Sequence, residues 1–210
     1  MAVPTSAAPT PTAPPTESAD PTADALLAAA LVVVAQHGLR GATTRRMAEQ
    51  AGVNEVTLFR KYGSKAELLR AALLRQAEAL GQSAVHYSGD LEHDLTELCR
   101  QYAQTLKQIG PVIGVLVTEL PRHPELMSVL DGPRELFGKV AGLLRSYQQA
   151  GQLQAEPLGT LIPALLGPLV MPYLVPIAAD LMRGETLELD PQAHVERFLH
   201  GRRSVKGDNP

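Results

Sequence analysis

The chain contains no tryptophan, one cysteine and few aromatic residues of any kind. Because Cys99 is alone, an intrachain disulfide is excluded, and a reducing cytoplasmic location is the natural expectation. Alternating β-branched runs are almost absent, which argues against an extensive sheet. Long apolar-periodic runs separated by Gly, Pro, Asn and Asp instead predict an all-α protein, in which Cys99 is a small buried hydrophobe.

The patterns of common catalytic sites are also missing. The six histidines are scattered without an H-x-x-x-H pair, and there is no glycine-rich phosphate loop or nucleophile elbow. The segment "DLEHD" (Asp90 to Asp94) contains three acids and a histidine, which resembles a metal-ligand set. Acids are, however, expected at the start of a helix, where they interact favourably with the helix dipole. We therefore predict no enzyme activity, no metal site and no cofactor.

Order-promoting residues are scarce at both ends of the chain. Residues 1–22 consist mostly of Ala, Pro and Thr, and they lack the basic start and the apolar block of a signal peptide. We expect a disordered tail there, and a second flexible tail over residues 202–210. The first tail has no Arg or Lys, which minor-groove arms of DNA-binding proteins carry.

Charge is absent from a 22-residue stretch, Leu158 to Ala179, which is long enough to span a membrane. No basic flank marks a cytoplasmic side, and Pro163, Pro168, Pro172 and Pro176 would each weaken an isolated helix. We therefore expect no membrane contact. The stretch instead predicts a kinked helix that is buried on all sides, in part by a second subunit.

The charge that is present is unevenly distributed. Residues 24–80 hold eight Lys or Arg against five Asp or Glu, whereas residues 81–210 hold eleven against fifteen. The stretch "TTRRMAEQAGVNEVTLFRKYGSK" (Thr43 to Lys65) contains five basic residues and only two acids. A basic segment joined to an acidic one indicates an anionic partner for the first part alone.

Apolar periodicity, caps and stop signals predict the helices. We expect one from Asp24 to Gly38, a second that follows the cap Thr43, a short third over Glu55 to Tyr62, and a fourth from the cap Ser64 to about Ala84. A fifth is expected over Asp90 to Ile109 and is broken by Pro111. Further helical patterns follow in "ELMSVL", in "PRELFGKVAGLLRSYQQAG" and in Asp190 to Gly201.

The second and third of these helices have helix-turn-helix spacing. Ala48 is small where the two helices cross, and Gly52 stands where the turn needs an unusual backbone angle. An inner apolar set faces the preceding helix: Met47, Ala51, Val53 and Leu58. An outer set can meet phosphates and base edges: Thr57, Phe59, Arg60 and Lys61. A plain helical hairpin with a solvated basic face has the same pattern.

Residues Asp24 to about Ala72 resemble the N-terminal DNA-binding domain of the TetR family of transcriptional regulators. The resemblance lies in the order and gaps of "TTRRMA", "AGV", "TLF" and "YGSKAELL", after a leading helix that ends in glycine. It implies a three-helix DNA-binding domain over residues 23–70 and a larger helical ligand-binding and dimerisation domain over residues 71–201.

Position by position, the resemblance implies a DNA-contacting set. Its members are Thr43, Thr44, Arg45, Glu55, Val56, Thr57, Phe59, Arg60, Lys61 and Lys65. Thr44 and Lys65 correspond to phosphate ligands, Arg45 to a residue that reaches a base, and Glu55, Val56 and Thr57 to base readers. Phe59 stands where the family usually has Tyr, and it cannot bind phosphate through a hydroxyl. Glu55 is equally consistent with a helix N-terminal acid stabilised by the helix dipole.

The resemblance also implies a homodimer built on two late helices, here about Pro157 to Met182 and Asp190 to His200, and a pocket for an unidentified apolar effector. The candidate ligand-binding residues are Tyr102, Leu106, Ile109, Ile113, Leu116, Met127, Phe137, Leu144, Met171 and Tyr173, with Tyr147 as a second polar group. The implied function is a ligand-released repressor of a palindromic double-stranded DNA operator. The alternative is a helical binding module that has lost DNA recognition, an interpretation that Glu55 and Phe59 support.

Overall fold

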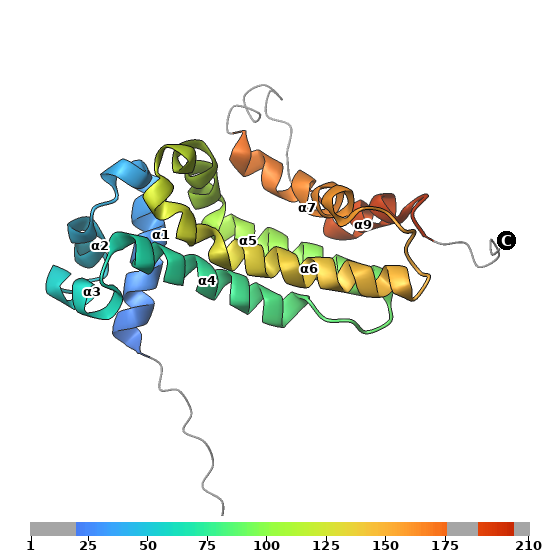
Figure 1. The fold of residues 1–210 in the computed structure, drawn as a ribbon, viewed down its shortest axis with the longest axis horizontal. Helices are drawn as coiled ribbons and strands as arrows, with labels where there is room; N and C mark the ends of the chain where they lie inside the picture. Colours follow the sequence, from blue (N-terminus) through green and yellow to red (C-terminus); the bar gives the residue numbers. More distant parts are fainter. Residues whose placement is uncertain (1–19, 176–188, 204–210) are drawn as a thin grey trace, which may run out of the picture.

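The computed structural model describes residues 20–175 and 189–203, and these form an all-α fold, as predicted (Figure 1). The α-helices are α1 (Pro21–Gly41), α2 (Thr44–Gln50), α3 (Glu55–Tyr62), α4 (Lys65–Ala84), α5 (Leu91–Glu119), α6 (Asp131–Gln149), α7 (Leu158–Leu174) and α9 (Pro191–Leu199). Two 3₁₀ helices, η1 (Leu120–Arg122) and η2 (Pro124–Leu130), join α5 to α6. Within the described residues, β pairing is limited to one isolated bridge between Leu153 and Arg203.

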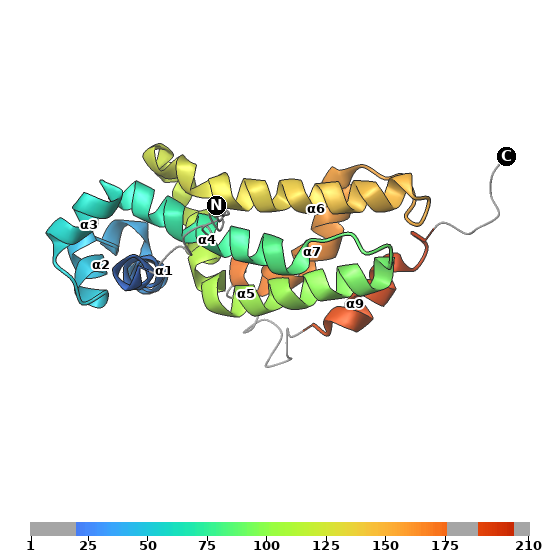
Figure 2. The same ribbon diagram turned by 90° about the horizontal axis from the view of Figure 1, so that it is seen from below.

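The helices form two regions, one at each end of the molecule (Figures 1 and 2). Helices α1 to α3 form a compact unit at one end of the molecule, and α4 leads from it into the rest of the chain. Helices α4, α5 and α6 run along the length of the molecule, and α7 and α9 pack on α5. The long helices therefore connect the unit of α1 to α3 physically to the far end of the fold.

Side-chain caps start most of the helices. Thr43, Ser64 and Asp190 cap α2, α4 and α9 through their side-chain oxygens, as the sequence predicts. Asp20 caps α1, so this helix begins at Pro21, inside the predicted N-terminal tail of residues 1–22. The remainder of that tail, residues 1–19, and residues 204–210 of the C-terminal tail lie outside the described residues.

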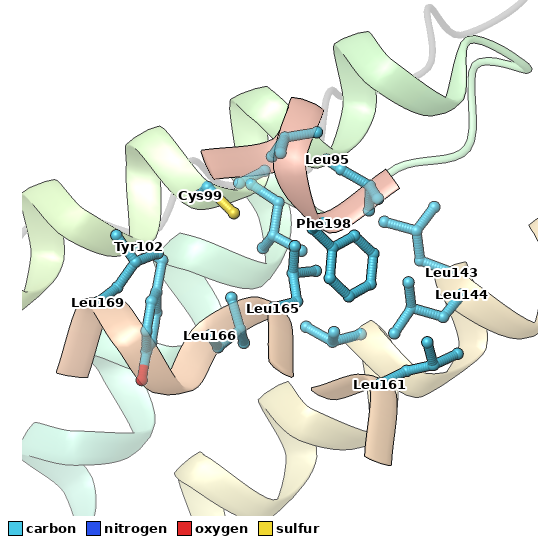
Figure 3. Close-up of a cluster of buried hydrophobic side chains, with 14 of the residues drawn as sticks. Leu95, Cys99, Tyr102, Leu143, Leu144, Leu161, Leu165, Leu166, Leu169 and Phe198 are labelled. Atoms are coloured by element: carbon cyan, nitrogen blue, oxygen red, sulfur yellow. The ribbon is translucent and has the colours of Figure 1, made fainter. Parts of the chain in front are cut away.

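Two clusters of buried apolar residues form the core. One lies among α5, α6, α7 and α9 (Figure 3). The other is built on α1 to α4, but it also includes Ile109, Val112 and Leu116 of α5. Helix α1 is long and apolar enough to cross a membrane by length and composition, and its buried residues belong to this second cluster. The C-terminal half of α5 is therefore part of the core beneath the N-terminal unit.

The predicted break at Pro111 is wrong, because α5 continues through it to Glu119. A proline inside a helix removes one hydrogen bond and costs about 3 kcal/mol. Burial on both sides of Pro111 offsets this cost: Ile109 and Val112 lie in the core, and Tyr173 packs on Gly110. A Cβ atom on Gly110 would lie 2.2 Å from Tyr173 Cδ1, so only glycine permits this contact.

Helix α7 also continues through its prolines, at positions 163, 168 and 172. It ends at Leu174. Pro176, the rest of the uncharged stretch to Ala179 and the end of the predicted dimerisation helix at about Met182 lie outside the described residues, which resume at Leu189.

Candidate DNA-binding surface and ligand cavity

The turn between α2 and α3 holds the two helices against α1. Met47 and Leu58 are fully buried, Ala48 is 1% exposed at the crossing, and Ala51 and Val53 pack against the same cluster. Gly52 has φ +69°, which a residue with a side chain rarely adopts. The inner set predicted from the sequence therefore forms the inner face of a helix-turn-helix.

The outer face of α3 is open to solvent. Val56 is 71% exposed and Phe59 is 48% exposed, while Arg60 and Lys61 are also exposed and Thr57 is half-buried. Large exposed apolar side chains beside basic ones are unusual on a helix whose opposite face is packed. They match the chemistry of a DNA groove, where thymine methyl groups are apolar and phosphates are anionic.

Helix α2 presents a second basic edge. The Arg45 side chain is 79% exposed, and its Nε donates to Glu49 Oε1 at 2.9 Å. Arg46 donates to the Gly41 carbonyl at 2.8 Å, and Thr43 caps the helix by accepting from the Arg46 amide at 3.3 Å. Arg45 is therefore accessible to a partner outside the chain, and its contact with Glu49 uses the Nε–H group.

Three further residues of the predicted DNA-contacting set, Thr44, Glu55 and Lys61, also make contacts within the chain. Thr44 Oγ1 donates to Glu55 Oε1 at 2.5 Å and so links the starts of α2 and α3. Lys61 forms an ion pair with Asp20, before α1. These contacts give Thr44 and Glu55 a structural role in fixing the two helices relative to each other.

Lys65 is placed differently from what its predicted role as a phosphate ligand suggests. It is half-buried, and its Nζ donates to the Leu39 carbonyl at 2.7 Å. Burial lowers the pKa of Lys65, against the opposing influence of Glu125 and Glu119. Lys65 therefore lies at the joint between α1, α4 and the end of α5, which spacing along the sequence does not reveal.

A cavity of about 620 Å³ lies between α4, α5, η2, α6 and α7. Among the described residues its wall is almost wholly apolar, with Gln76, Tyr102 and Thr105 as the principal polar residues and no charged side chain. Burial raises the pKa of Tyr102 to about 12, so its hydroxyl remains protonated near neutral pH. The cavity is suited to an uncharged, largely apolar molecule.

Comparison with known proteins agrees with this geometry. Residues 26–72 match the family model described as bacterial regulatory proteins, tetR family. The N-terminal domain belongs to the TetR family. The chain is 26% identical over 135 residues to the uncharacterized HTH-type transcriptional regulator YvkB of Bacillus subtilis, covering 64% of this chain and 71% of YvkB. It is 33% identical over 106 residues to Rv1556 of Mycobacterium tuberculosis, also an uncharacterized HTH-type transcriptional regulator, covering 50% of this chain and 51% of Rv1556.

The TetR likeness extends to the fold of the second domain. The fatty acid degradation regulator FadR from Bacillus halodurans has a TM-score of 0.64 and 20% identity, covering 88% of this chain and 95% of that protein. At this identity the likeness shows the fold alone. By sequence, the chain spans about half the length of the mycobacterial relative that it matches. The matched family model and the curated relatives are those of regulators of transcription.

The structure brings most of the predicted ligand-binding residues of this TetR fold together. Seven line the cavity: Tyr102, Leu106, Ile109, Ile113, Leu116, Met127 and Phe137. Leu144 instead lies in the closed cluster with Leu161 and Phe198 (Figure 3). Met171 is 50% exposed on α7, and Tyr173 packs on Gly110. These three do not line the cavity.

Several lining residues were not predicted because they lie on α4 and α7, whose apolar residues the sequence assigns mainly to core packing and to the dimer interface. Helix α4 contributes Leu73, Gln76, Ala77 and Leu80, and α7 contributes Val170 and Leu174. The apolar stripe of α4 predicts burial but not whether a protein or a ligand covers it. Only the relative positions of α4, α5 and α6 decide that.

The second predicted polar group, Tyr147, lies elsewhere in the domain. It is fully buried, and its hydroxyl donates to Asp94, a carboxylate that also accepts from the Ser88 amide at 2.7 Å and the Ser88 hydroxyl at 2.6 Å. Of the "DLEHD" acids, Asp90 caps α5 and Glu92 pairs with Arg203. These acids therefore satisfy groups within the fold. Cys99 is buried as expected, and burial raises the pKa of its thiol to about 12.

One face of α7 carries a line of small and apolar residues. Pro163, Pro168 and Met171 are exposed, and Gly167 between them is half-buried. The opposite face, with Leu161, Leu165 and Leu169, is packed in the core. Positions 160, 163, 164, 167, 168 and 171 share the outer face by helical spacing. We call this set the α7 outer face.

Proposed function

We propose that this TetR-family chain is a cytoplasmic, homodimeric repressor that binds a palindromic DNA operator and is released by a small apolar molecule. The observation that carries the proposal is the exposed face of α3. Val56, Phe59, Arg60 and Lys61 lie there on a helix whose other face holds the fully buried Leu58. A helix of this kind on a helix-turn-helix unit enters the major groove.

The side chains suggest how the groove is read. Val56 and Phe59 suit contact with thymine methyl groups, and Arg45 suits the O6 and N7 acceptors of guanine. Arg60 and Lys61 provide positive charge for phosphates. Phe59 therefore contributes an apolar base contact in place of the phosphate contact that a tyrosine hydroxyl makes.

The proposed effector is uncharged and largely apolar. The cavity volume of about 620 Å³ falls within the usual range for small-molecule sites, and the lining residues that the structure describes carry no charge. Burying an ion there without a partner would be strongly unfavourable. Gln76, Tyr102 and Thr105 can orient the molecule by hydrogen bonds.

The proposed dimer forms through the α7 outer face, together with α9. A two-fold axis there repeats the same surface on both subunits, which suits a narrow stripe of small residues. Helix α9 borders α7 and presents Gln192, Glu196 and Arg197 to solvent as a polar rim. Two recognition helices would then contact half-sites separated by roughly 34–36 Å.

The test is a fluorescence-anisotropy titration of the protein with DNA from upstream of its own gene and with scrambled DNA, at two salt concentrations. We expect tight, sequence-selective binding that weakens steeply with salt, because phosphate contacts release counterions. If upstream DNA is not selected, a random-site selection identifies the operator. A protein that selects no sequence from a random pool would contradict the proposal.

The same titration distinguishes the proposed repressor from the alternative function, which is a helical binding module without DNA recognition. The contact between Thr44 and Glu55 favours that alternative, since it occupies two predicted DNA ligands within the chain. Such a module would bind DNA weakly and equally for all sequences. Its apolar partner would bind with little dependence on salt.

A further inference from the structure

One carboxylate from the second domain holds the backbone of the DNA-binding domain. Glu119, in the last turn of α5, accepts a hydrogen bond from the Leu39 amide in α1, with 2.9 Å between Oε2 and N. The two residues are 80 positions apart in the sequence. This contact joins the two domains through a single charged side chain.

The backbone conformation at Gly38 leaves room for the Glu119 carboxylate. Gly38 breaks α1 with φ +66° and ψ 177°, a conformation that residues with side chains rarely adopt. A Cβ atom on Gly38 would lie 2.6 Å from Glu119 Oε1. The conformation therefore favours glycine, and the Glu119 carboxylate occupies the space that a side chain at position 38 would take. Because Leu39 begins the turn after this break, its amide needs an acceptor in the way that the first amides of a helix do.

The other polar group of Leu39 is held from a different direction. Its carbonyl accepts from Lys65 Nζ at the start of α4, at 2.7 Å. Leu39 itself is fully buried. The turn that leads from α1 into α2 is thus fixed between a carboxylate on α5 and an ammonium group on α4. We call Glu119, Leu39 and Lys65 the Leu39 clamp.

The clamp adjoins the ligand cavity. Leu116, Val117, Leu120 and Pro121, on both sides of Glu119 in the sequence, all line the cavity. A molecule that pushes this wall outward therefore moves the backbone that carries Glu119. A helix end of this kind transmits displacement because its neighbours in the core are closely packed.

We propose that Glu119 is the positioning residue that couples occupancy of the cavity to the orientation of the helix-turn-helix. With the cavity empty, Glu119 holds Leu39 and fixes α2 and α3 for DNA. With the cavity filled, the Leu116–Pro121 wall moves, the Leu39 amide loses its acceptor, and α2 and α3 lose that orientation. The proposal deepens the proposed function and rests on it.

The first measurement is hydrogen exchange at the Leu39 amide, which needs neither DNA nor an effector. Glu119→Ala should exchange this amide roughly tenfold faster or more, because the acceptor is gone. Glu119→Gln should remain near the wild type, since its side-chain carbonyl also accepts. Glu97→Ala is the matched control: Glu97 is on α5 and contacts Arg100 and Gln101 of the same helix. Unchanged exchange in Glu119→Ala would overturn the clamp.

The second measurement is the coupling itself, with the DNA sequence taken from random-site selection. The cavity is filled in two ways, with the uncharged dye Nile red and by Ile113→Trp. In the wild type, filling should weaken DNA binding roughly tenfold, within the usual range of allosteric coupling. In Glu119→Ala it should change binding less than about twofold, and Glu119→Gln should restore the wild-type response.

The outcomes separate the two proposals. A wild type that selects no DNA sequence overturns the proposed function, while the exchange measurement still reports on the clamp. DNA affinity that is indifferent to both ways of filling the cavity overturns the coupling. Faster exchange in Glu119→Ala with the full wild-type response to filling shows that the clamp is structural only, and it also overturns the coupling proposal.

Discussion

The helix-turn-helix unit and the cavity-bearing domain are built from similar amphipathic helices, yet they use apolar surface in opposite ways. In the first, Met47 and Leu58 are fully buried and the outer face carries basic side chains. In the second, α4, α5 and α6 leave about 620 Å³ between apolar walls. A filled core holds its side chains in one arrangement. The walls of a cavity lack packing contacts, so their arrangement can change when a molecule occupies it.

This difference assigns different tasks to the two regions. The helix-turn-helix must keep its readers in one geometry to recognise a sequence, so its internal contacts are short and local. In the proposed function the cavity-bearing domain changes when a ligand enters it, so its contacts with the first region determine the response. The Leu39 clamp connects the helix-turn-helix unit to the cavity-bearing domain.

The largest expected effect comes from breaking the proposed dimer without touching either region. Gly167→Arg places a charge on the α7 outer face, where a Cβ atom would have open space among the described residues of the subunit. The subunit should fold and become monomeric. Its affinity for a palindromic operator should fall roughly 100-fold or more, because the two half-sites are no longer linked. Analytical ultracentrifugation and anisotropy titration measure the two effects.

Gly138→Arg is the matched control. Gly138 is also a helical glycine with open space around its Cβ position, but it lies on the exposed face of α6. It should remain dimeric and bind DNA as the wild type does. A dimeric Gly167→Arg protein would show that the subunits meet through another surface.

A smaller effect is expected from the DNA-reading face. Arg45→Ala should reduce the preference for the operator over scrambled DNA by roughly tenfold, the usual consequence of losing one bidentate guanine contact. Folding should be unaffected, since Arg45 is exposed and contacts only Glu49. Anisotropy titration with both DNAs measures the ratio. An equal loss for the two DNAs would show that Arg45 contacts only phosphate.

The helix-turn-helix could be predicted almost completely from the sequence because its determinants are local. Thr43 and Ser64 cap helices within three residues of themselves, and Gly52 turns the chain at its own position. The inner set follows from helical spacing over about a dozen residues. Each of these features depends on near neighbours in the chain.

The rest of the molecule depends on contacts between distant residues. Pro111 was expected to end a helix, but packing of its neighbours on α1 and α7 keeps α5 continuous. The apolar periodicity of α6 identifies both Phe137 and Leu144 as buried or ligand-facing, and only the fold separates the cavity wall from the closed core. No local pattern indicates that Glu119 binds Leu39.

The smallest effect on DNA binding is expected at Asp94, which is buried near the start of α5, at the end of that helix away from the helix-turn-helix (Figure 2). Asp94 is fully buried and accepts hydrogen bonds from Ser88 and Tyr147. Asp94→Asn replaces one accepting oxygen with a donor that faces other donors, so it should destabilise the fold by about 1–3 kcal/mol. DNA affinity should stay within about twofold of the wild type, because additivity holds between distant sites.

The pH dependence of this effect provides its own check. Burial alone would raise the pKa of Asp94, but the hydrogen bonds from Ser88 and Tyr147, with His86 nearby, hold it below its ordinary value. The ionised carboxylate therefore stabilises the fold above the ordinary aspartate pKa, and this contribution is lost as the pH falls through the lowered folded-state pKa. Urea denaturation at several pH values should show the stability gap between wild type and Asp94→Asn narrowing in acid. A gap that is constant with pH would mean that the cost comes from altered packing and not from the loss of a charged acceptor.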